Sequence, residues 1–283
     1  MNKWNLIVDV ANCTNCQLCV LAVQDEHVGN EFPGYAAEMP KHGHRWIEID
    51  RYERGQGDKV DVAYVPTMCQ HCDDAPCIAA ARDGAAYKRD DGIVVIDPDK
   101  AKGQRQIAEA CPYDAVWWNE DLDIPQHWFF DAHLLDAGWH APRCASVCPT
   151  GALRVEKVSD ERMAEIARDE ELEPLRPDLE TRPRVHYRNL WRAKRAFVAG
   201  TVSGKVNGVI DCIEGATVTL TGGSNGSVML ETDGFGDFKF DRLPADGQSC
   251  TIQIAAAGFA TAERSLTLSE STNLGDIRLE RTG

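Results

Sequence analysis

Short apolar runs alternate with loop segments over the first 155 residues of the chain. Asp97-Pro98 offers an N-cap followed by a first helical residue, so we expect a helix over 100–110 that ends at Cys111-Pro112. The order of loop, helix, Cys-Pro turn and strand is repeated, which predicts a duplicated arrangement. The expected strands are Asn5 to Val10, Arg45 to Tyr52, Gly92 to Ile96 and Ala115 to Asn119.

A charged segment with several prolines follows, over residues 156–196. Ser159 is placed to cap a surface helix at its start. Beyond the prolines, Tyr187, Leu190 and Trp191 are the side chains expected to dock the segment onto the rest of the protein. The segment is therefore predicted to be a connector.

From about Phe197 the polar and apolar residues alternate with a period of two, in seven short runs. Turn residues such as Asp233-Gly234 separate these runs. Seven short strands at regular spacing predict a small β-sandwich of immunoglobulin-like or transthyretin-like type. Its two cysteines, Cys212 and Cys250, are expected to be buried free thiols, with a disulfide as the alternative.

Cysteine spacing indicates the chemistry of the N-terminal half. Nine of the eleven cysteines precede residue 150. In a bacterial two-cluster ferredoxin, three close cysteines hold one [4Fe–4S] cluster, and a later Cys-Pro cysteine ligates the other cluster. Zinc is the alternative metal, although its sites favour two separated pairs of ligands, and disulfide frameworks are typical of small secreted scaffolds. The spacings are Cys13-x2-Cys16-x2-Cys19 and Cys69-x2-Cys72-x4-Cys77, with Cys111-Pro112 and Cys148-Pro149 downstream.

These patterns predict an α+β chain in three parts. A tandem ferredoxin-like [4Fe–4S] domain is expected over 1–155, a docking connector over 156–196 and an all-β sandwich over 197–283. Because the cluster loops have little regular structure of their own, the first domain should be poorly ordered without iron.

Charge and hydropathy exclude several partners. The 283 residues carry a formal net charge of −15, which argues against nucleic acid and anionic membrane surfaces as partners. No stretch approaches the ~20 apolar residues that a membrane helix needs. The N-terminus lacks an apolar signal region, so a cytoplasmic location is predicted, with export beside a signal-bearing partner as the alternative.

Longer motifs give the chain a family resemblance that covers nearly its whole length. It resembles the iron–sulfur small subunits of molybdopterin enzymes of the dimethyl sulfoxide reductase family, most closely those of the pyrogallol–phloroglucinol transhydroxylase type. Most relatives of that wider family lack a β-domain like the one expected here. The motifs that carry the resemblance are HGHRWIEIDRYERG, CQHCDDAPC, DGIVVIDPDKAKG, CPYDAVWWNE, AHLLD, TRPRVHYRNLWR and FGDFKFDRL.

The resemblance implies how the cysteines pair. A first cysteine set would hold one [4Fe–4S] cluster, and a second cysteine set would hold another. The transhydroxylase-type subunits hold a third cluster between these two, but this chain has Val23, Trp128, Asp131 and Cys144 at the corresponding positions. Carboxylate suits a cubane poorly, so we expect the third cluster to be lost and Cys144 to be a buried thiol. The first set is Cys13, Cys16, Cys19 and Cys148, and the second set is Cys69, Cys72, Cys77 and Cys111.

The resemblance also implies a function for the chain as part of a heterodimer. A large partner subunit would carry molybdenum on a bis-pterin cofactor and perform the chemistry on polyhydroxylated benzenes, as a transhydroxylase or hydroxylase. We therefore nominate no catalytic residue in this chain. His42 and His44 are expected to be surface or interface histidines. The alternatives are an electron-transfer subunit with net redox turnover, serving a resorcinol-type hydroxylase or a dehydroxylase, and a largely structural subunit.

Overall fold

The structure is a computed structural model that describes residues 1–223 and 226–282. It divides into two compact units. The N-terminal unit comprises Met1–Arg51 and Tyr64–Leu190, and the C-terminal unit comprises Tyr52–Ala63 and the chain from Trp191 onward. None of the helices described is long and apolar enough to span a lipid bilayer.

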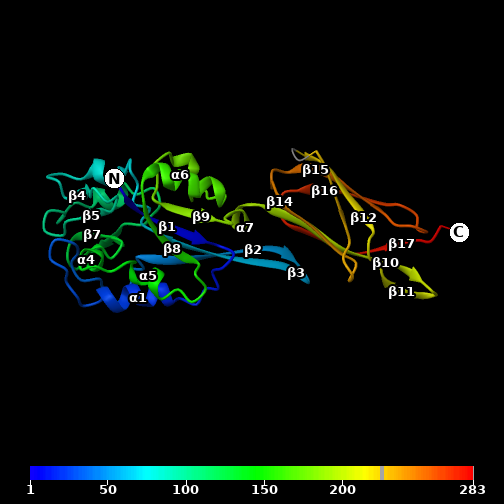
Figure 1. The fold of residues 1–283 in the computed structure, drawn as a ribbon, viewed down its shortest axis with the longest axis horizontal. Coiled ribbons are helices and arrows are strands. Elements are labelled where there is room, and N and C mark those ends of the chain that lie inside the picture. The colour runs from blue at the N-terminus through cyan, green and yellow to red at the C-terminus, as the bar shows by residue number, and fades with distance from the viewer. Residues whose placement is uncertain (224–225, 283) are drawn as a thin grey trace. The chain divides into compact units, whose positions relative to one another are not determined.

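A three-stranded sheet in the order β8-β1-β9 frames the N-terminal unit (Figure 1). β1 (Lys3–Asp9) pairs antiparallel with β8 (Leu153–Val158) and parallel with β9 (Val185–Arg188). All five residues from Trp4 to Val8 are buried, as expected of a central strand that is covered on both faces. The strand predicted here is confirmed, and it fixes the start of the first cysteine loop, which follows it directly.

Helix α6 (Asp160–Asp169) follows β8 and confirms the cap predicted at Ser159. The Ser159 hydroxyl oxygen accepts a backbone N–H from three residues later at 3.3 Å. The buried side chains Met163 and Ile166 pack with Ile7 of β1. The polar face of the helix remains outside, so the helix covers one face of the sheet.

The helix expected over 100–110 is wrong in length, because only α3 (Gln106–Glu109) is helical. The Asp97 carboxylate accepts the N–H groups two and three residues later at 3.0 and 3.2 Å, which closes a local turn. Gly103 then adopts a φ of +72°. This left-handed conformation prevents the turn from continuing as a helix.

The other elements of the N-terminal unit alternate with loops, and two of its strands, β2 and β3, continue into the C-terminal unit. The strands predicted over 45–52, 92–96 and 115–119 are confirmed as β2, β5 and β6, with shifted ends. The elements are α1 (Leu18–His27), β2 (Ile47–Gln56), β3 (Lys59–Met68), α2 (Pro76–Ala80), β4 (Ala86–Lys88), β5 (Val94–Ile96), β6 (Trp117–Asn119), β7 (Ile124–Gln126), α4 (Ala132–Asp136), α5 (Arg143–Ser146) and η1 (Pro177–Leu179).

Two four-stranded sheets build the sandwich of the C-terminal unit (Figure 1). One has the order β11-β10-β14 with β17 parallel to β10, and the other has the order β13-β12-β15-β16. Alternate residues such as Val218, Leu220, Ile252 and Ile254 point into a shared apolar core. The seven predicted strands are confirmed, and β11 is an additional one. The elements are α7 (Trp191–Lys194), β10 (Ala196–Val206), β11 (Val209–Cys212), β12 (Thr217–Gly222), β13 (Ser227–Glu231), β14 (Asp237–Leu243), β15 (Gln248–Ala255), β16 (Ala262–Leu268) and β17 (Thr272–Leu279).

The outer part of the β2–β3 hairpin, residues 52–63, belongs to the C-terminal unit. The Arg54 guanidinium, 9% exposed, pairs with Asp61 at 2.6 Å and with Asp241 of β14 at 2.7 Å. Gly55 has a φ of +91°, and a Cβ on it would lie 2.4 Å from the Phe197 ring. Only glycine satisfies both constraints, so packing against Phe197 and the ion pairs attach the hairpin to the sandwich.

Replacing Asp61 with asparagine should destabilise the C-terminal unit in a pH-dependent way. Burial by itself would raise the pKa of Asp61, but hydrogen bonds from Arg192 and Arg54 outweigh it and lower the pKa from 3.8 to about 2. A lowered pKa contributes stability that is present above the unfolded value and is lost as pH falls toward the folded value. By calorimetry, the difference in melting temperature between wild type and Asp61→Asn should be full at pH 7 and shrink between about pH 4 and pH 2. A difference that is constant across this range would contradict the ion-pair argument.

Candidate iron–sulfur sites

The first cysteine set comes together where β1 ends and α1 begins. Burial raises the pKa of Cys19 to about 12, and the other three thiols of the set raise it as well, because they lie close by. Burial likewise raises the pKa of Cys13, and Cys148 and Cys16 raise it further. Cys16 is exposed, while Cys13 and Cys148 are half-buried. The structure therefore groups the four predicted ligands at a site near the protein surface.

The second cysteine set is grouped in the same way, but deeper in the protein. Burial raises the pKa of Cys77 to about 12, and Cys111 and Cys72 add to this effect. Burial also places the pKa of Cys69 well above its usual value, again with contributions from the other thiols of its set. Cys69, Cys72 and Cys77 are each 6–7% exposed. The structure thus brings together both sets that the resemblance implied.

The donor chemistry of both sets fits an iron–sulfur cluster. Grouped thiols that are buried without a metal resist ionisation, and bound iron reverses this because it stabilises the thiolates. All eight cysteines are free of disulfides. Asn15 and His71 adopt left-handed backbone conformations, with φ of +57° and +45°, and their N–H groups donate to Cys13 and Cys69. Such inward-turned amides are typical of a pocket for a negatively charged group.

The position expected for a third cluster is filled by buried side chains. Val23, Trp128, Asp131 and Cys144 are all at most 1% exposed. Asp131 accepts a hydrogen bond from the Arg143 backbone N–H at 2.7 Å, and its second oxygen lies 3.1 Å from His27 Nε2. Asp131 retains a left-handed φ of +49°. Both Asp131 oxygens thus have partners within the protein, and Val23, Trp128 and Asp131 offer no thiolate, so these residues do not fit a cubane.

The third-cluster position lies between the two cysteine sets. Cys144 is close enough to Cys19 and Cys148 for those thiols to raise its pKa, although burial is the main cause. On the other side, the Trp128 ring lies 5.5 Å from the ring of His71, which follows Cys69 by two residues. Protein side chains therefore occupy the interval between the sets.

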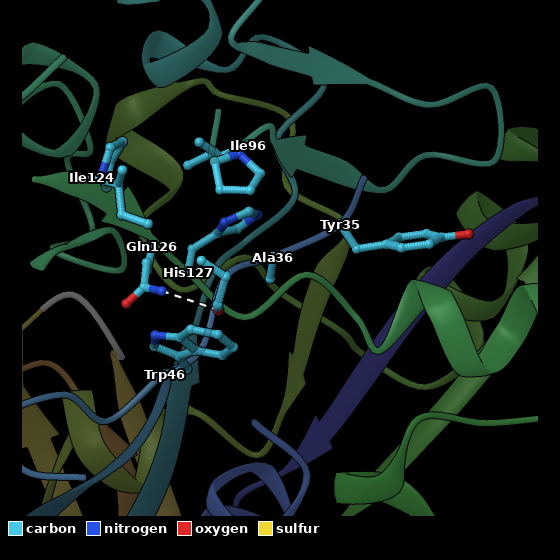
Figure 2. Close-up of a pocket in the computed structure, with 10 residues that line it drawn as sticks. Tyr35, Ala36, Trp46, Ile96, Ile124, Gln126 and His127 are labelled. Carbon is cyan, nitrogen blue, oxygen red and sulfur yellow. Dashed lines mark hydrogen bonds between the residues drawn. The ribbon is translucent and has the colours of Figure 1, made fainter. Parts of the chain in front are cut away.

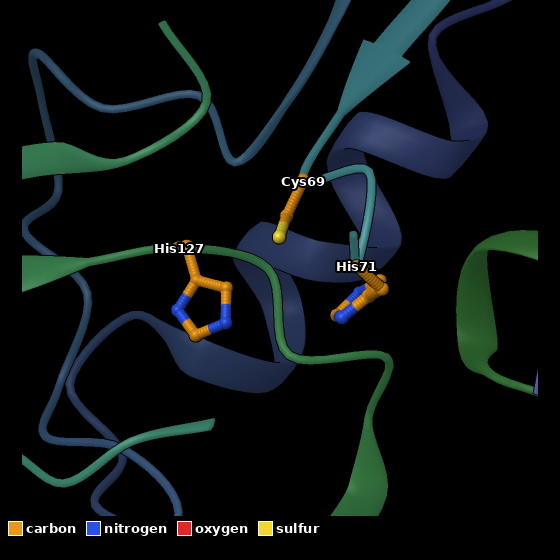
Figure 3. A group of neighbouring side chains, drawn as sticks. All are labelled: Cys69, His71 and His127. Carbon is orange, nitrogen blue, oxygen red and sulfur yellow. The ribbon is translucent and has the colours of Figure 1, made fainter. Parts of the chain in front are cut away.

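Two buried histidines flank Cys69 in the second set. One ring nitrogen of His71 and one of His127 lie within 4.8 Å of each other and of Cys69 Sγ, and the sulfur points between the rings in Figure 3. The Val94 peptide fixes both tautomers, because its N–H donates to His71 Nδ1 at 3.1 Å and its carbonyl accepts from His127 Nε2 at 3.0 Å. His71 Nε2 therefore carries a proton, which disqualifies this atom as a metal ligand.

Residues that support the second set were not singled out in the sequence. Lys88 Nζ donates to the carbonyls of His71 and Cys72 at 2.6 and 2.9 Å, and it pairs with Asp73 at 2.8 Å. Arg184 binds the same Asp73 carboxylate through two nitrogens at 2.6 and 2.8 Å. The acidic pair within CQHCDDAPC and the basic TRPR segment were the signal that could have predicted this contact.

Two expectations about single residues are corrected. His44 is 8% exposed and its Nε2 lies 3.0 Å from the Trp118 carbonyl, so it is not a surface histidine, whereas His42 is exposed. Cys212 is exposed because it lies on the edge strand β11, while Cys250 is buried as predicted. Both are free thiols.

The cavity drawn in Figure 2 is too small for an aromatic substrate. Its volume is about 10 Å³, which is room for a single water molecule. Trp46 and His127 line it, and so does Gln126, whose side chain donates to the Ala37 carbonyl at 3.2 Å. This cavity therefore gives no reason to place substrate chemistry beside the second cysteine set.

Two sets of four thiols on a mixed α+β frame, joined to a β-sandwich, define a two-cluster iron–sulfur protein. Residues 60–158 match the family of 4Fe-4S dicluster domains, and residues 198–280 match carboxypeptidase regulatory-like domains. The thiosulfate reductase electron transfer subunit of Salmonella typhi is 28% identical over 56% of this chain and 78% of its own. The minor pilin GBS52 of Streptococcus agalactiae overlaps 35% of this chain and 49% of its own with a TM-score of 0.26 and 15% identity, too low to carry an argument.

One relative matches at full length. The pyrogallol hydroxytransferase small subunit of Pelobacter acidigallici is 42% identical over 99% of this chain and 100% of its own. The similarity therefore includes the β-sandwich as well as the cysteine loops. This chain belongs to the family of iron–sulfur small subunits that includes the pyrogallol hydroxytransferase small subunit.

Proposed function

We propose that this chain is the iron–sulfur small subunit of a molybdopterin-dependent transhydroxylase or hydroxylase acting on polyhydroxylated benzenes of the pyrogallol and phloroglucinol type. The observation that carries the proposal is the 42% identity to a pyrogallol hydroxytransferase small subunit from one end to the other. A large partner subunit would bear the molybdenum bis-pterin cofactor and the substrate. A reducing, cytoplasmic compartment suits a chain whose eleven cysteines are all free.

In this proposal the first and second cysteine sets each hold one [4Fe–4S] cluster. When bound, these clusters supply one-electron storage. The chain's own residues position them. The backbone N–H groups of Asn15 and His71 donate to sulfur atoms of the two sets, and Lys88 donates to the His71 carbonyl in the loop of the second set. Trp128 and Asp131 fill the interval between the sets, so the chain favours a reaction without net electron export. Transfer of a hydroxyl between aromatic rings is such a reaction.

A second candidate is an electron-transfer subunit with net redox turnover. The exposure of Cys16, with half-buried Cys13 and Cys148 beside it, favours this interpretation, because an external redox partner could approach the first set closely. The two candidates differ in whether electrons leave through this chain during turnover.

Anaerobic purification of the tagged chain from its native cells tests the proposal. We expect a large chain containing molybdenum to copurify, with about eight irons per small chain. Adding pyrogallol should leave the paramagnetic resonance signals of the clusters largely unchanged during turnover. Rapid reduction of both clusters by pyrogallol would favour the electron-transfer candidate instead. Zinc in place of iron, or about twelve irons per chain, would contradict the cluster assignment.

A further inference from the structure

Residues 181–184 of the predicted connector lie directly against the loop of the second cysteine set. The N–H groups of Asp73 and Asp74 donate to the carbonyls of Arg182 and Thr181 at 2.9 and 3.1 Å. Arg184 N–H donates in turn to the Gln70 carbonyl at 2.8 Å. These bonds place a segment that is distant in sequence beside the ligand loop in a fixed register. We call residues 181–184 the strap.

The strap brings one hydroxyl to a sulfur atom of the second set. Thr181 is 5% exposed, and its carbonyl accepts the N–H of Asp74, two residues after Cys72. Burial raises the pKa of the Cys72 thiol, and the Thr181 hydroxyl is close enough to oppose this as a hydrogen-bonding group. Its Oγ1 also lies 2.7 Å from the hydroxyl of Tyr113, which comes two residues after Cys111. A threonine hydroxyl has a single proton, so when that proton points to the sulfur, Tyr113 must be the donor to Thr181. The two hydroxyl groups thus lead from half-buried Tyr113 to buried Thr181, which lies beside Cys72.

We propose that Thr181, supported by Tyr113, is a positioning residue that raises the reduction potential of the cluster bound by the second cysteine set. Reduction adds negative charge to a cluster and its thiolates, and a hydroxyl donor aimed at a sulfur stabilises that charge. The reduced state therefore gains more from the hydrogen bond than the oxidised state does. Removing the donor should lower the potential.

The surroundings of the second set make the effect specific to this cluster. Three of its four cysteines, Cys72 among them, are only 6–7% exposed, so water has little access to Cys72 to replace a lost donor, and electrostatic effects are stronger away from solvent. Cys16 of the first set is exposed, so water competes with protein donors there. The strap would therefore raise the reduction potential of the second cluster without raising that of the first.

Thr181→Val removes the hydroxyl while keeping the side chain's shape, and Thr181→Ser keeps the hydroxyl. We would purify the intact complex of each variant anaerobically, measure its iron, and titrate the clusters by paramagnetic resonance at controlled potentials. For Thr181→Val we expect roughly fivefold to tenfold less reduced second cluster at a fixed potential, where tenfold corresponds to ~59 mV for one electron. Thr181→Ser should restore the wild-type value, and Tyr113→Phe should give a smaller shift in the same direction.

The first cluster serves as an internal reference, because none of the three variants changes a ligand of the first cysteine set. The signal of the second cluster is assigned as the one lost in Cys72→Ala. An unchanged potential in Thr181→Val with full iron, or an equal shift in Thr181→Ser, would overturn the proposal. If Thr181→Val fails to retain iron, the Tyr113→Phe titration decides in the same way. The inference rests on the proposed cluster assignment, whose own failure would appear separately as a wild-type iron content other than about eight.

Discussion

Replacing Cys72 with alanine should halve the iron content of the chain, from about eight atoms to about four. Cys72 is buried and grouped with Cys111 and Cys77, so no other thiol of the second set can take its place. Because cluster binding contributes to folding free energy, the N-terminal unit should lose ~5 kcal/mol or more of stability, whereas the sandwich should keep its own. Iron analysis and anaerobic thermal unfolding measure the two effects.

Two cysteine variants act as controls for this result. Cys212→Ala changes an exposed thiol of the sandwich and should leave iron and stability unchanged. Cys144→Ala tests the position expected for the third cluster, where Asp131 already hydrogen-bonds to His27. It should keep about eight irons and lose only the packing of one sulfur atom. Loss of iron in Cys144→Ala would mean that a third cluster survives, and full iron in Cys72→Ala would refute the ligand assignment.

Replacing Arg184 with alanine should have the second-largest effect on stability. Its side chain is 5% exposed and binds the Asp73 carboxylate through two nitrogens, and it also reaches Asp160 of α6 at 3.0 Å. The substitution leaves Asp73 partly buried with only Lys88 as its cationic partner. We expect a loss of about 2–3 kcal/mol, since breaking one side of a buried ion pair is costly. Anaerobic urea unfolding of the holo-protein measures it, and chelators should remove iron from the second set faster.

A neighbouring arginine offers a matched control for this prediction. Arg182 also pairs with an aspartate of the cysteine loop, Asp74, but both side chains are more than half exposed. Solvent screening makes such a pair contribute little, so Arg182→Ala should unfold like the wild type. Equal effects of the two substitutions would mean that the strap is held by its backbone bonds, and that burial of Arg184 does not matter.

Much of the architecture followed from local signals in the sequence. The apolar run of β1 and the serine before α6 predicted both elements because their causes are local: continuous burial and a side-chain cap. The sandwich strands followed from alternation with a period of two. The helix predicted after Asp97 was wrong because the same side chain can close a turn, and Gly103 then took a left-handed conformation.

The sequence by itself predicted the iron–sulfur chemistry of this protein. Three close thiols and a later Cys-Pro are the pattern that [4Fe–4S] clusters take, and Val23, Trp128 and Asp131 lack the sulfur that a third cluster would need. The tertiary structure alone decided which distant groups serve those thiols. Thr181 and Tyr113 are 68 residues apart, yet their hydroxyl groups meet at 2.7 Å. His44 was expected at the surface and is buried, and Cys212 was expected to be buried and is exposed. Both expectations failed because burial depends on how segments pack, which no local pattern records.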